Sequence, residues 1–296
     1  MSDRIIGMLL DTPIEQYKVA GRTVYVKRED LCAPEDWPPF SKLRGLYAYL
    51  RLRKTQGLET VGYTETTVSM AGWGIAAVAH SLGMRAVIFP PDYKHPEKRK
   101  DLPWLEHHRQ KWVRWGAEIV PLPAARHQIN WYRGKNYLTK HYGTKTEMLP
   151  LGIPFQETVE ETAKVWQACP AELRRGTTVA CMGSGTIFSG LMRGWQPGDG
   201  RLVGVLVHKG INAAEMLTKC MSKAHRLFGG LVGSPASAVQ IIDGKWDYHE
   251  TGNIEAPFPC HQYYDLKGWQ WLVENLHSLP DPVMFWNIGH SPVETK

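Results

Sequence analysis

Lys42 is the residue around which the candidate chemistry of this sequence gathers. It follows a short apolar run at Val24–Val26, a charged stretch and the proline-broken segment Trp37–Phe40, and a helix is expected to begin directly after it. This order would place its amine at the carboxyl edge of a sheet, where α/β proteins bind their ligands. A lysine held there can condense with the carbonyl group of a cofactor. On position alone, a solvated surface lysine is the commoner alternative.

A glycine-rich turn supplies the second chemical feature. Gly183-Ser184-Gly185-Thr186 follows the apolar run Thr177–Met182 and precedes a second apolar stretch. Its glycines allow close backbone approach, and the amides at the start of a helix favour an anion. The turn lacks the GxxxxGK[ST] pattern of a P-loop, and it lacks the third glycine and acidic partner of a dinucleotide motif. A single phosphate on a small cofactor fits better, with a tight turn that binds nothing as the alternative.

A strand-and-helix alternation must position these two features. Strands are expected at 24–26, 60–63, 86–90, 118–122, 177–182, 202–207 and 283–286, with a further one ending at 148–152, and helices at 43–54, 73–82, 102–116, 128–142, 158–169 and 267–276. This βαβ rhythm predicts an α/β protein with two sheet-forming regions. Together, a lysine and a phosphate cup on such a scaffold favour pyridoxal phosphate, whose aldehyde reacts with an amine.

Composition narrows the class of protein. The chain has 296 residues, 43% of them hydrophobic and 22% charged, which is typical of a soluble globular protein of one large or two medium domains. Its five cysteines are odd in number and scattered, so neither a disulfide framework nor a metal site is expected, and a reducing compartment is favoured. No signal peptide or membrane span is apparent, which predicts a cytoplasmic location, the host cytoplasm if the protein is viral.

The order of the short motifs resembles that of the tryptophan-synthase-β-like, or fold type II, pyridoxal-phosphate enzymes. The branch it resembles most is that of 1-aminocyclopropane-1-carboxylate deaminase and D-cysteine desulfhydrase. The motifs are Thr12–Glu15, Val24–Leu31, Ser41–Arg44, Ser69–Ala71, Gly183–Thr186 and Tyr264–Lys267. The resemblance implies two open twisted α/β domains with the cofactor in the cleft between them, and a homodimer. Residues 1–50 and 155–296 would form the large cofactor-binding domain and residues 51–154 the small one.

The resemblance also implies roles for individual residues. Lys42 matches the Schiff-base lysine of the family's N-K-x-R motif, although the asparagine is Ser41 here. Ser69 matches the serine of the family's S-N-H loop, which holds the substrate carboxylate and helps to move protons, but the asparagine of that loop is Met70. The substrate-binding residues implied by this loop are Ser69, Met70, Ala71 and Gly72.

The carboxyl-terminal part of the chain supplies the remaining implied contacts. Tyr264 matches a tyrosine near the cofactor ring, and Asp265 falls where the deaminases carry a glutamate against the pyridine nitrogen. A carboxylate there keeps that nitrogen protonated, so the ring accepts the electron pair released at the substrate Cα. Ile288 falls in the last cofactor-binding turn, where His290 replaces a glycine and is more simply a structural histidine. The implied catalytic set is Lys42, Ser69 and Tyr264, and the cofactor-binding set is Lys42, Gly183, Ser184, Gly185, Thr186, Asp265 and Ile288.

A basic, tryptophan-rich segment at 94–135 is not explained by this site. The chain carries a formal charge of +6 and 12 tryptophans. Positive charge and exposed rings would suit duplex DNA. The alternative is an amphipathic helix whose Trp104, Trp112 and Trp115 pack inward.

Three functions remain open from the sequence. The first is a lyase or decarboxylase acting at the Cα of an amino-acid group attached to a modified thymine, as in the phage enzymes of DNA hypermodification. The second is a deaminase or desulfhydrase of free amino acids. The third is a non-catalytic nucleic-acid-binding relative, which retention of both Lys42 and the phosphate cup argues against.

Overall fold

The computed structural model describes residues 12–95, 102–210, 212–225 and 236–291. Its larger sheet has six strands, parallel except for the edge strand β1, which pairs antiparallel with β2. In spatial order these strands are β1 (Ile14–Val19), β2 (Arg22–Arg28), β12 (Val283–Asn287), β9 (Thr177–Met182), β10 (Arg201–Leu206) and β11 (Val239–Ile242). Strands from both ends of the chain therefore build one sheet.

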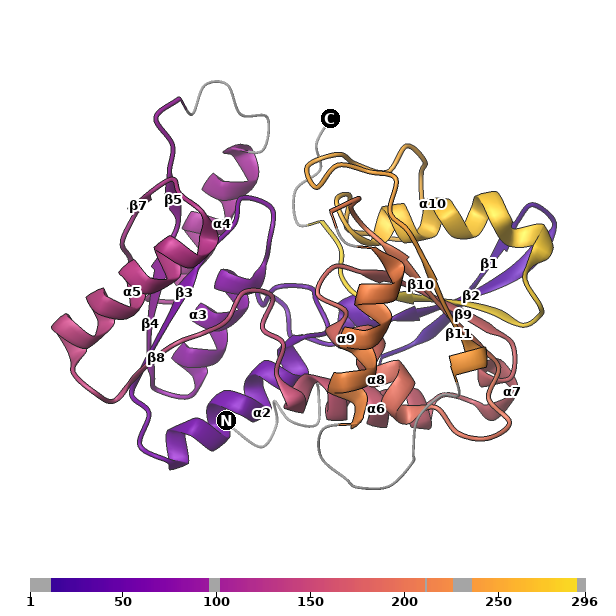
Figure 1. Cartoon of the computed structure of the whole chain (residues 1–296), viewed down its shortest axis with the longest axis horizontal. Coiled ribbons are helices and arrows are strands. Elements are labelled where there is room, and N and C mark those ends of the chain that lie inside the picture. The colour runs from indigo at the N-terminus through magenta and orange to yellow at the C-terminus, as the bar shows by residue number, and fades with distance from the viewer. Residues whose placement is uncertain (1–11, 96–101, 211, 226–235, 292–296) are drawn as a thin grey trace.

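A smaller, fully parallel sheet comes from the middle of the sequence. Its strands are β6 (Glu118–Ile119), β4 (Arg85–Phe89), β3 (Thr60–Thr64) and β8 (Thr146–Met148). The short strands β5 (Pro91–Asp92) and β7 (Leu122–Pro123) follow β4 and β6 in the chain and pair with each other as a separate two-stranded sheet. Every residue of β3 is buried, as expected for a central parallel strand covered on both faces. Figure 1 shows this sheet on the left and the larger one on the right.

Helices cover both sheets. Beside the smaller sheet lie α3 (Ala71–Ser81), α4 (Leu102–Arg114) and α5 (His127–Tyr142), whereas α7 (Ala171–Arg174), α8 (Thr186–Gly194), α9 (Ala213–His225) and α10 (Asp265–Asn275) belong to the larger one. Short 3-10 turns occupy Glu29–Leu31, Ala236–Ala238 and Leu276–Ser278. Separate apolar cores lie on the two faces of the larger sheet, one under α6, α8 and α9 and the other under α10.

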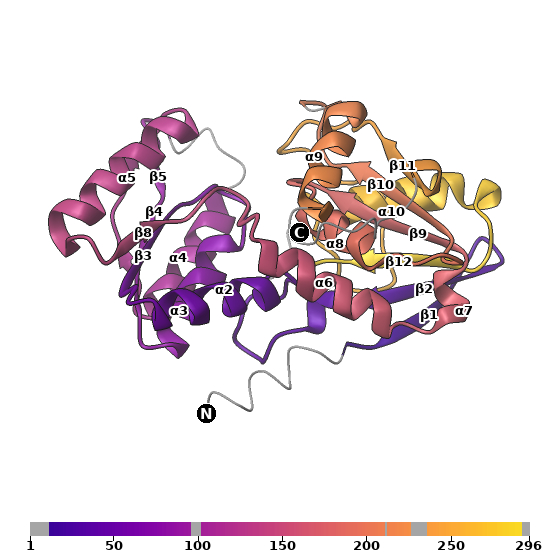
Figure 2. The same ribbon diagram turned by 60° about the horizontal axis from the view of Figure 1, so that its bottom comes forward.

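Two helices join the two halves of the molecule. α2 (Leu43–Thr55) on the side of the smaller sheet and α6 (Gln156–Ala168) on the side of the larger one pack against each other (Figure 2). They approach so closely that a Cβ at Gly45 would lie 2.2 Å from the Thr158 Cα, which only glycine avoids. The start of α2, where Lys42 stands, is thus held at the junction of the sheets.

The predicted α/β class with parallel sheets is confirmed, and most predicted elements occur within a few residues of their expected bounds. The single strand expected at 118–122 was wrong, because β6 and β7 belong to different sheets. Pro121 separates them and has no N–H to donate to a ladder. Helix α9 and strands β1 and β11 were not foreseen.

The tryptophans of the basic segment follow the amphipathic alternative where the structure describes them. Trp104 and Trp112 on α4 are fully buried, and Trp115 packs edge-on against Trp37. Residues 96–101 of this segment lie outside the described residues. Stacking of bases on Trp104 or Trp112 is therefore excluded by their burial. No helix in the described part of the chain is long and apolar enough to cross a membrane.

Candidate active site

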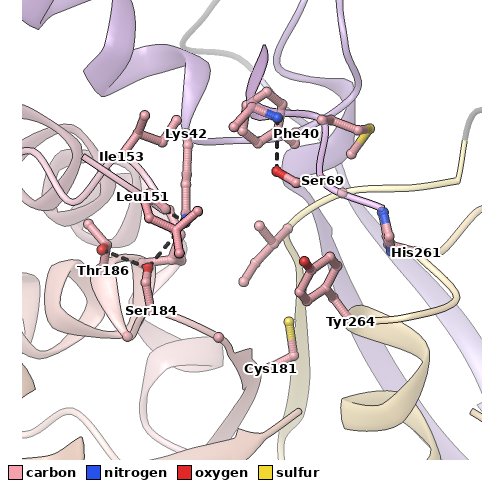
Figure 3. A pocket seen from close by; sticks show the side chains of 18 of the residues that line it. Phe40, Lys42, Ser69, Leu151, Ile153, Cys181, Ser184, Thr186, His261 and Tyr264 are labelled. Atoms are coloured by element: carbon pink, nitrogen blue, oxygen red, sulfur yellow. Dashed lines mark hydrogen bonds between the residues drawn. The ribbon is translucent and has the colours of Figure 1, made fainter. Parts of the chain in front are cut away.

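A cavity of about 520 Å³ opens between the two sheets. The ends of β9 and β12, the start of α10 and the turn before α8 form one side, and the loop before α3 forms another (Figure 3). The residues predicted from the sequence that line it are Lys42, Ser69, Met70, Ala71, Gly183, Ser184, Gly185, Thr186, Tyr264, Asp265 and Ile288. The fold thus gathers at one place side chains that are up to 246 positions apart, from Lys42 to Ile288.

Lys42 extends across this cavity toward the glycine-rich turn (Figure 3). Its Nζ donates to the Gly152 carbonyl oxygen at 2.9 Å and to the Ser184 Oγ at 3.2 Å. Burial, and then the positive charge of Lys223, lower the pKa of Lys42 to about 8. A lysine with a lowered pKa has a larger neutral fraction, and the neutral amine is the nucleophile that attacks a carbonyl carbon.

The backbone before Lys42 is tied to the end of β12. Phe40 forms an antiparallel bridge with Gly289, and the Ser41 N–H donates to the Ile288 carbonyl oxygen at 2.9 Å. The His290 N–H closes the arrangement on the Pro39 carbonyl oxygen at 3.1 Å. The central strand of the larger sheet therefore fixes where α2 begins, and with it the origin of the Lys42 side chain.

Buried ion pairs support this junction from behind. Arg44, two residues after Lys42, donates from two nitrogens to the Glu29 carboxylate at 3.1 Å each. The Asp30 carboxylate accepts from Arg28 at 2.8 Å and lies 3.0 Å from the Nδ1 of His290. Because His290 is engaged with Asp30 and does not line the cavity, its place is the structural one favoured by the sequence.

The glycine-rich turn has the geometry of an anion cradle. Gly185 is the N-cap of α8 with φ +75°, a left-handed conformation, and a Cβ there would lie 2.7 Å from the Cys220 Sγ. The Ser184 and Thr186 hydroxyl oxygens lie 2.9 Å apart at the mouth of the helix. A Cβ on Gly183 would project toward the Tyr264 ring, 3.8 Å away, so its absence leaves room beside the turn. These donors and this space fit the phosphate of pyridoxal phosphate.

Asp265, at the start of α10, is a buried acid facing the same cavity. Its Oδ1 accepts the Ile288 N–H at 2.9 Å and the Cys181 Sγ–H at 3.3 Å. Burial raises the pKa of Asp265 to about 7. In the described part of the chain no cationic side chain pairs with it, so a protonated ring nitrogen would supply the missing opposite charge. Asp265 therefore also fits the cofactor.

Tyr264 faces Lys42 from across the cavity, with Ser69 above it in Figure 3. Its hydroxyl hydrogen-bonds to that of Tyr248, and burial raises the pKa of Tyr264 well above its ordinary value. Its ring lies 4.7 Å, centroid to centroid, from that of His261. A phenol is protonated at neutral pH, so Tyr264 is in the form that can donate a proton, while the raised pKa makes it a weaker acid than a free phenol.

The loop before α3 differs from the wall formed by the larger sheet. The Ser69 Oγ accepts the Ala71 N–H at 3.1 Å, and the thioether of Met70 is buried beside Gly289. Gly72, which we predicted to contact substrate, does not line the cavity. Its N–H donates instead to the carboxyl group of Glu65.

Glu65 was missed by sequence reasoning. It is 5% exposed, its Oε1 accepts the Thr66 N–H at 2.8 Å, and burial raises its pKa to about 8. A carboxyl group at the N-terminus of α3 uses donors that another anion would otherwise bind. The only signal in the sequence is an acidic residue directly after the apolar strand β3. Glu65 itself does not line the cavity; the lining residues that were not foreseen include Tyr63, Thr66, Gly152, Ile153, His208, Lys219 and Tyr248.

Comparison with known proteins identifies the family. No protein-family model matches the chain. The chain is 34% identical over 286 residues to a protein of Pseudomonas phage M6 named "Glycyl-dTMP PLP-dependent decarboxylase", where PLP is pyridoxal phosphate. The match covers 94% of this chain and 98% of the phage protein.

Solved structures share the fold at lower identity. A homologue of ACC deaminase has a TM-score of 0.74 at 19% identity and covers 98% of this chain and 95% of its own. O-ureido-L-serine synthase has a TM-score of 0.66 at 16% identity, with 97% and 91% covered. Diaminopropionate ammonia lyase of Escherichia coli has a TM-score of 0.64 at 15% identity, with 97% and 87% covered. The chain therefore has the fold of the fold type II enzymes and belongs to the family of the phage pyridoxal-phosphate-dependent decarboxylase.

Proposed function

We propose that this protein is a pyridoxal-phosphate-dependent decarboxylase that removes CO₂ from an amino-acid group carried on a modified thymine nucleotide. The observation that carries the proposal is the 34% identity to the phage glycyl-dTMP decarboxylase along nearly the whole of both chains. The cavity supports it independently, because it presents an amine, an anion cradle and a buried acid in one space.

Different residues of the cavity are proposed to hold different parts of the cofactor. Lys42 would hold the cofactor covalently through its aldehyde carbon, and the turn Gly183–Thr186 would hold its phosphate. Asp265, beside the backbone of Ile288, would pair with the ring nitrogen. When bound, the cofactor supplies an electron sink for the pair left at the substrate Cα as the bond to the carboxylate breaks.

Two hydrogen-bonding groups complete the reaction. Ser69 orients the substrate at the loop before α3, where Met70 and Ala71 also line the cavity. A proton must replace the departing CO₂ at Cα, and Lys42 or the protonated phenol of Tyr264 donates it. The net change is one C–C bond broken and one C–H bond formed, with no oxidant or reductant required.

Mass spectrometry of the reaction tests the proposal. Glycyl-dTMP is incubated with the holoenzyme and, as the matched control, with Lys42→Ala. We expect the wild type to yield a product lighter by CO₂, and the variant to leave the substrate unchanged. A product lighter by ammonia would favour the deaminase alternative instead.

A deaminase or desulfhydrase of free amino acids is the second candidate, supported by the shared fold with the ACC deaminase homologue. The 19% identity of that likeness carries the fold alone. The same enzyme samples, offered 1-aminocyclopropane-1-carboxylate or D-cysteine, distinguish the two functions. Release of ammonia or sulfide faster than release of CO₂ from the nucleotide would reverse our assignment. The non-catalytic alternative has no support from the family.

A DNA-linked form of the substrate would require a surface for the polyanion, and α5 offers one. This helix contains no acidic residue. Its exposed side includes Tyr132, 62% exposed, and Ile129, with Arg133, Lys135 and Lys140 also exposed. We propose that duplex DNA contacts this surface. Its phosphates would bind the three cationic side chains, and the Tyr132 ring would make a further contact with the DNA.

The DNA contact is tested by binding to duplex DNA over a range of salt concentrations. Substitution of Arg133, Lys135 and Lys140 by Gln should weaken binding. It should also reduce the slope of log K against log salt concentration by about 0.9 per lost phosphate contact. Lys164→Gln on α6, also an exposed lysine, is the control for charge. Lack of binding at low salt would restrict the substrate to the free nucleotide.

Three further expectations belong to this proposal. The residue ranges 1–50 with 155–296, and 51–154, are the large and small domains. The protein acts as a homodimer, which light scattering of the purified holoenzyme tests. It works in the cytoplasm, the host's if the protein is viral, which imaging or fractionation of expressing cells tests.

A further inference from the structure

Lys223 reaches the anion cradle from a helix that the sequence did not reveal. Its Nζ donates to the Ser184 carbonyl oxygen at 2.8 Å and to the Thr186 Oγ1 at 3.2 Å. It stands on α9, which packs beside α8 and is distant in sequence from every motif of the family resemblance. The glycine-rich turn is therefore contacted by a second amine besides Lys42.

The packing of α9 fixes this approach. Met216 and Cys220 are fully buried against Gly185, and the Cys220 Sγ–H donates to the Gly185 carbonyl oxygen at 3.5 Å. Residues three and four apart share one side of a helix, so Lys223 emerges on the side that carries Cys220. The sulfur atoms occupy the space that a side chain on Gly185 would need. The position of Lys223 is thus set by the same contacts that require glycine in the turn.

The charge arrangement points to a dianionic occupant. Lys42 contacts the Ser184 Oγ from the cavity, and Lys223, which is not among the lining residues, contacts the Ser184 carbonyl oxygen from α9, so two amines contact one residue. Two like charges that contact the same turn raise each other's energy, and after burial the charge of Lys223 contributes to the lowered pKa of Lys42. A phosphate bound between them would offset that repulsion with charge-assisted hydrogen bonds.

We infer that Lys223 binds the phosphate of the cofactor and completes the cradle formed by the turn before α8. The inference rests on the cofactor assignment in the proposed function. The proposed function assigns the phosphate to the glycine-rich turn alone, and this inference adds a cationic side chain from a separate helix. Its consequence is that α9 and the turn bind the cofactor together.

The affinity of the apoprotein for pyridoxal phosphate tests this inference. Titration followed by the visible absorbance of the lysine-bound cofactor gives Kd for the wild type, Lys223→Met and the charge control Lys164→Met. We expect Kd to rise roughly 10- to 100-fold in Lys223→Met, as for loss of a charge-assisted hydrogen bond. Lys164→Met should keep the wild-type Kd, because 64% of that side chain is exposed on α6.

Inorganic phosphate provides a readout that does not involve the covalent link. It should raise the Tm of the wild-type apoprotein and raise that of Lys223→Met much less. Lys223→Arg should recover most of the cofactor affinity, and Lys223→Gln serves if the methionine variant fails to fold. An unchanged Kd in folded Lys223→Met or Lys223→Gln would overturn the inference. A wild type that binds no cofactor would instead overturn the proposed function.

Discussion

The two walls of the cavity differ in kind. The wall from the larger sheet and α2 presents charge and fixed donors: the amine of Lys42, the turn before α8 and the buried acid Asp265. The wall from the smaller sheet presents the hydroxyl of Ser69, the thioether of Met70 and, behind them, the buried Glu65. The first set is the one that we propose holds the cofactor. The second set stands where the substrate is proposed to bind, so it is where a change of substrate would be accommodated.

If this division holds, changes in the first wall should affect cofactor binding or the chemical step. The largest expected effect is that of Lys42→Ala, which removes the amine proposed to attach the cofactor covalently. Visible absorbance should lose the band of the lysine-bound cofactor, and CO₂ release should fall below detection. Lys54→Ala, an exposed lysine on the same helix, is the control. A variant that keeps both signals would remove Lys42 from the mechanism.

Asp265→Asn should lower kcat by roughly 10²-fold, within the range seen when a group that assists proton or charge transfer is lost. Asparagine can still accept the Ile288 N–H, so the fold and the affinity for the cofactor should change little. Steady-state kinetics together with a cofactor titration separate the two effects. An unaltered kcat would mean that the acid does not tune the ring.

Ser69→Ala tests the other wall. Loss of its hydroxyl should raise the substrate KM roughly tenfold, as for loss of one hydrogen bond, while the Kd of the cofactor stays the same. Kinetics with glycyl-dTMP and cofactor titration supply both numbers. The division between the walls would fail if cofactor affinity fell and KM did not.

Glu65→Gln should change the pH dependence of stability. Because the pKa of Glu65 is raised to about 8, the folded state holds a proton that the unfolded state releases near pH 4.5. Its contribution is therefore full below pH 4.5 and is lost as the pH rises toward 8, by at most about 1.4 kcal/mol per pH unit. Denaturant unfolding of the apoprotein should show a smaller loss between these pH values in the variant. Glu172→Gln, an exposed acid on α7, should behave as the wild type.

The sequence was informative where chemistry depends on neighbouring residues. The turn Gly183–Thr186 could be predicted because glycine, hydroxyl and helix start are adjacent in the chain. Lys42 could be placed because the strand, loop and helix around it are local. The strand break at Pro121 could have been anticipated from the missing N–H, yet the apolar pattern outweighed it.

Long-range partners could not be predicted in the same way. Glu65 gains its place only when the loop before α3 folds back, so that Gly72 donates to a carboxyl group seven residues earlier. Lys223 reaches the cradle through packing of α9 on α8, 37 positions from Thr186. No motif records such a contact. Glu65 lies behind the loop before α3 and Lys223 contacts the turn before α8, so the sequence left a supporting contact unpredicted on each side of the cavity.

The central claim is that Lys42 carries the cofactor between the two walls. Borohydride reduction of the holoenzyme makes the cofactor–lysine link permanent, and peptide mass mapping then locates the labelled lysine. We predict one labelled peptide, containing Lys42, and no label on the peptide containing Lys223. Label on a different lysine, or no label in a preparation that releases CO₂ from glycyl-dTMP, would contradict the account.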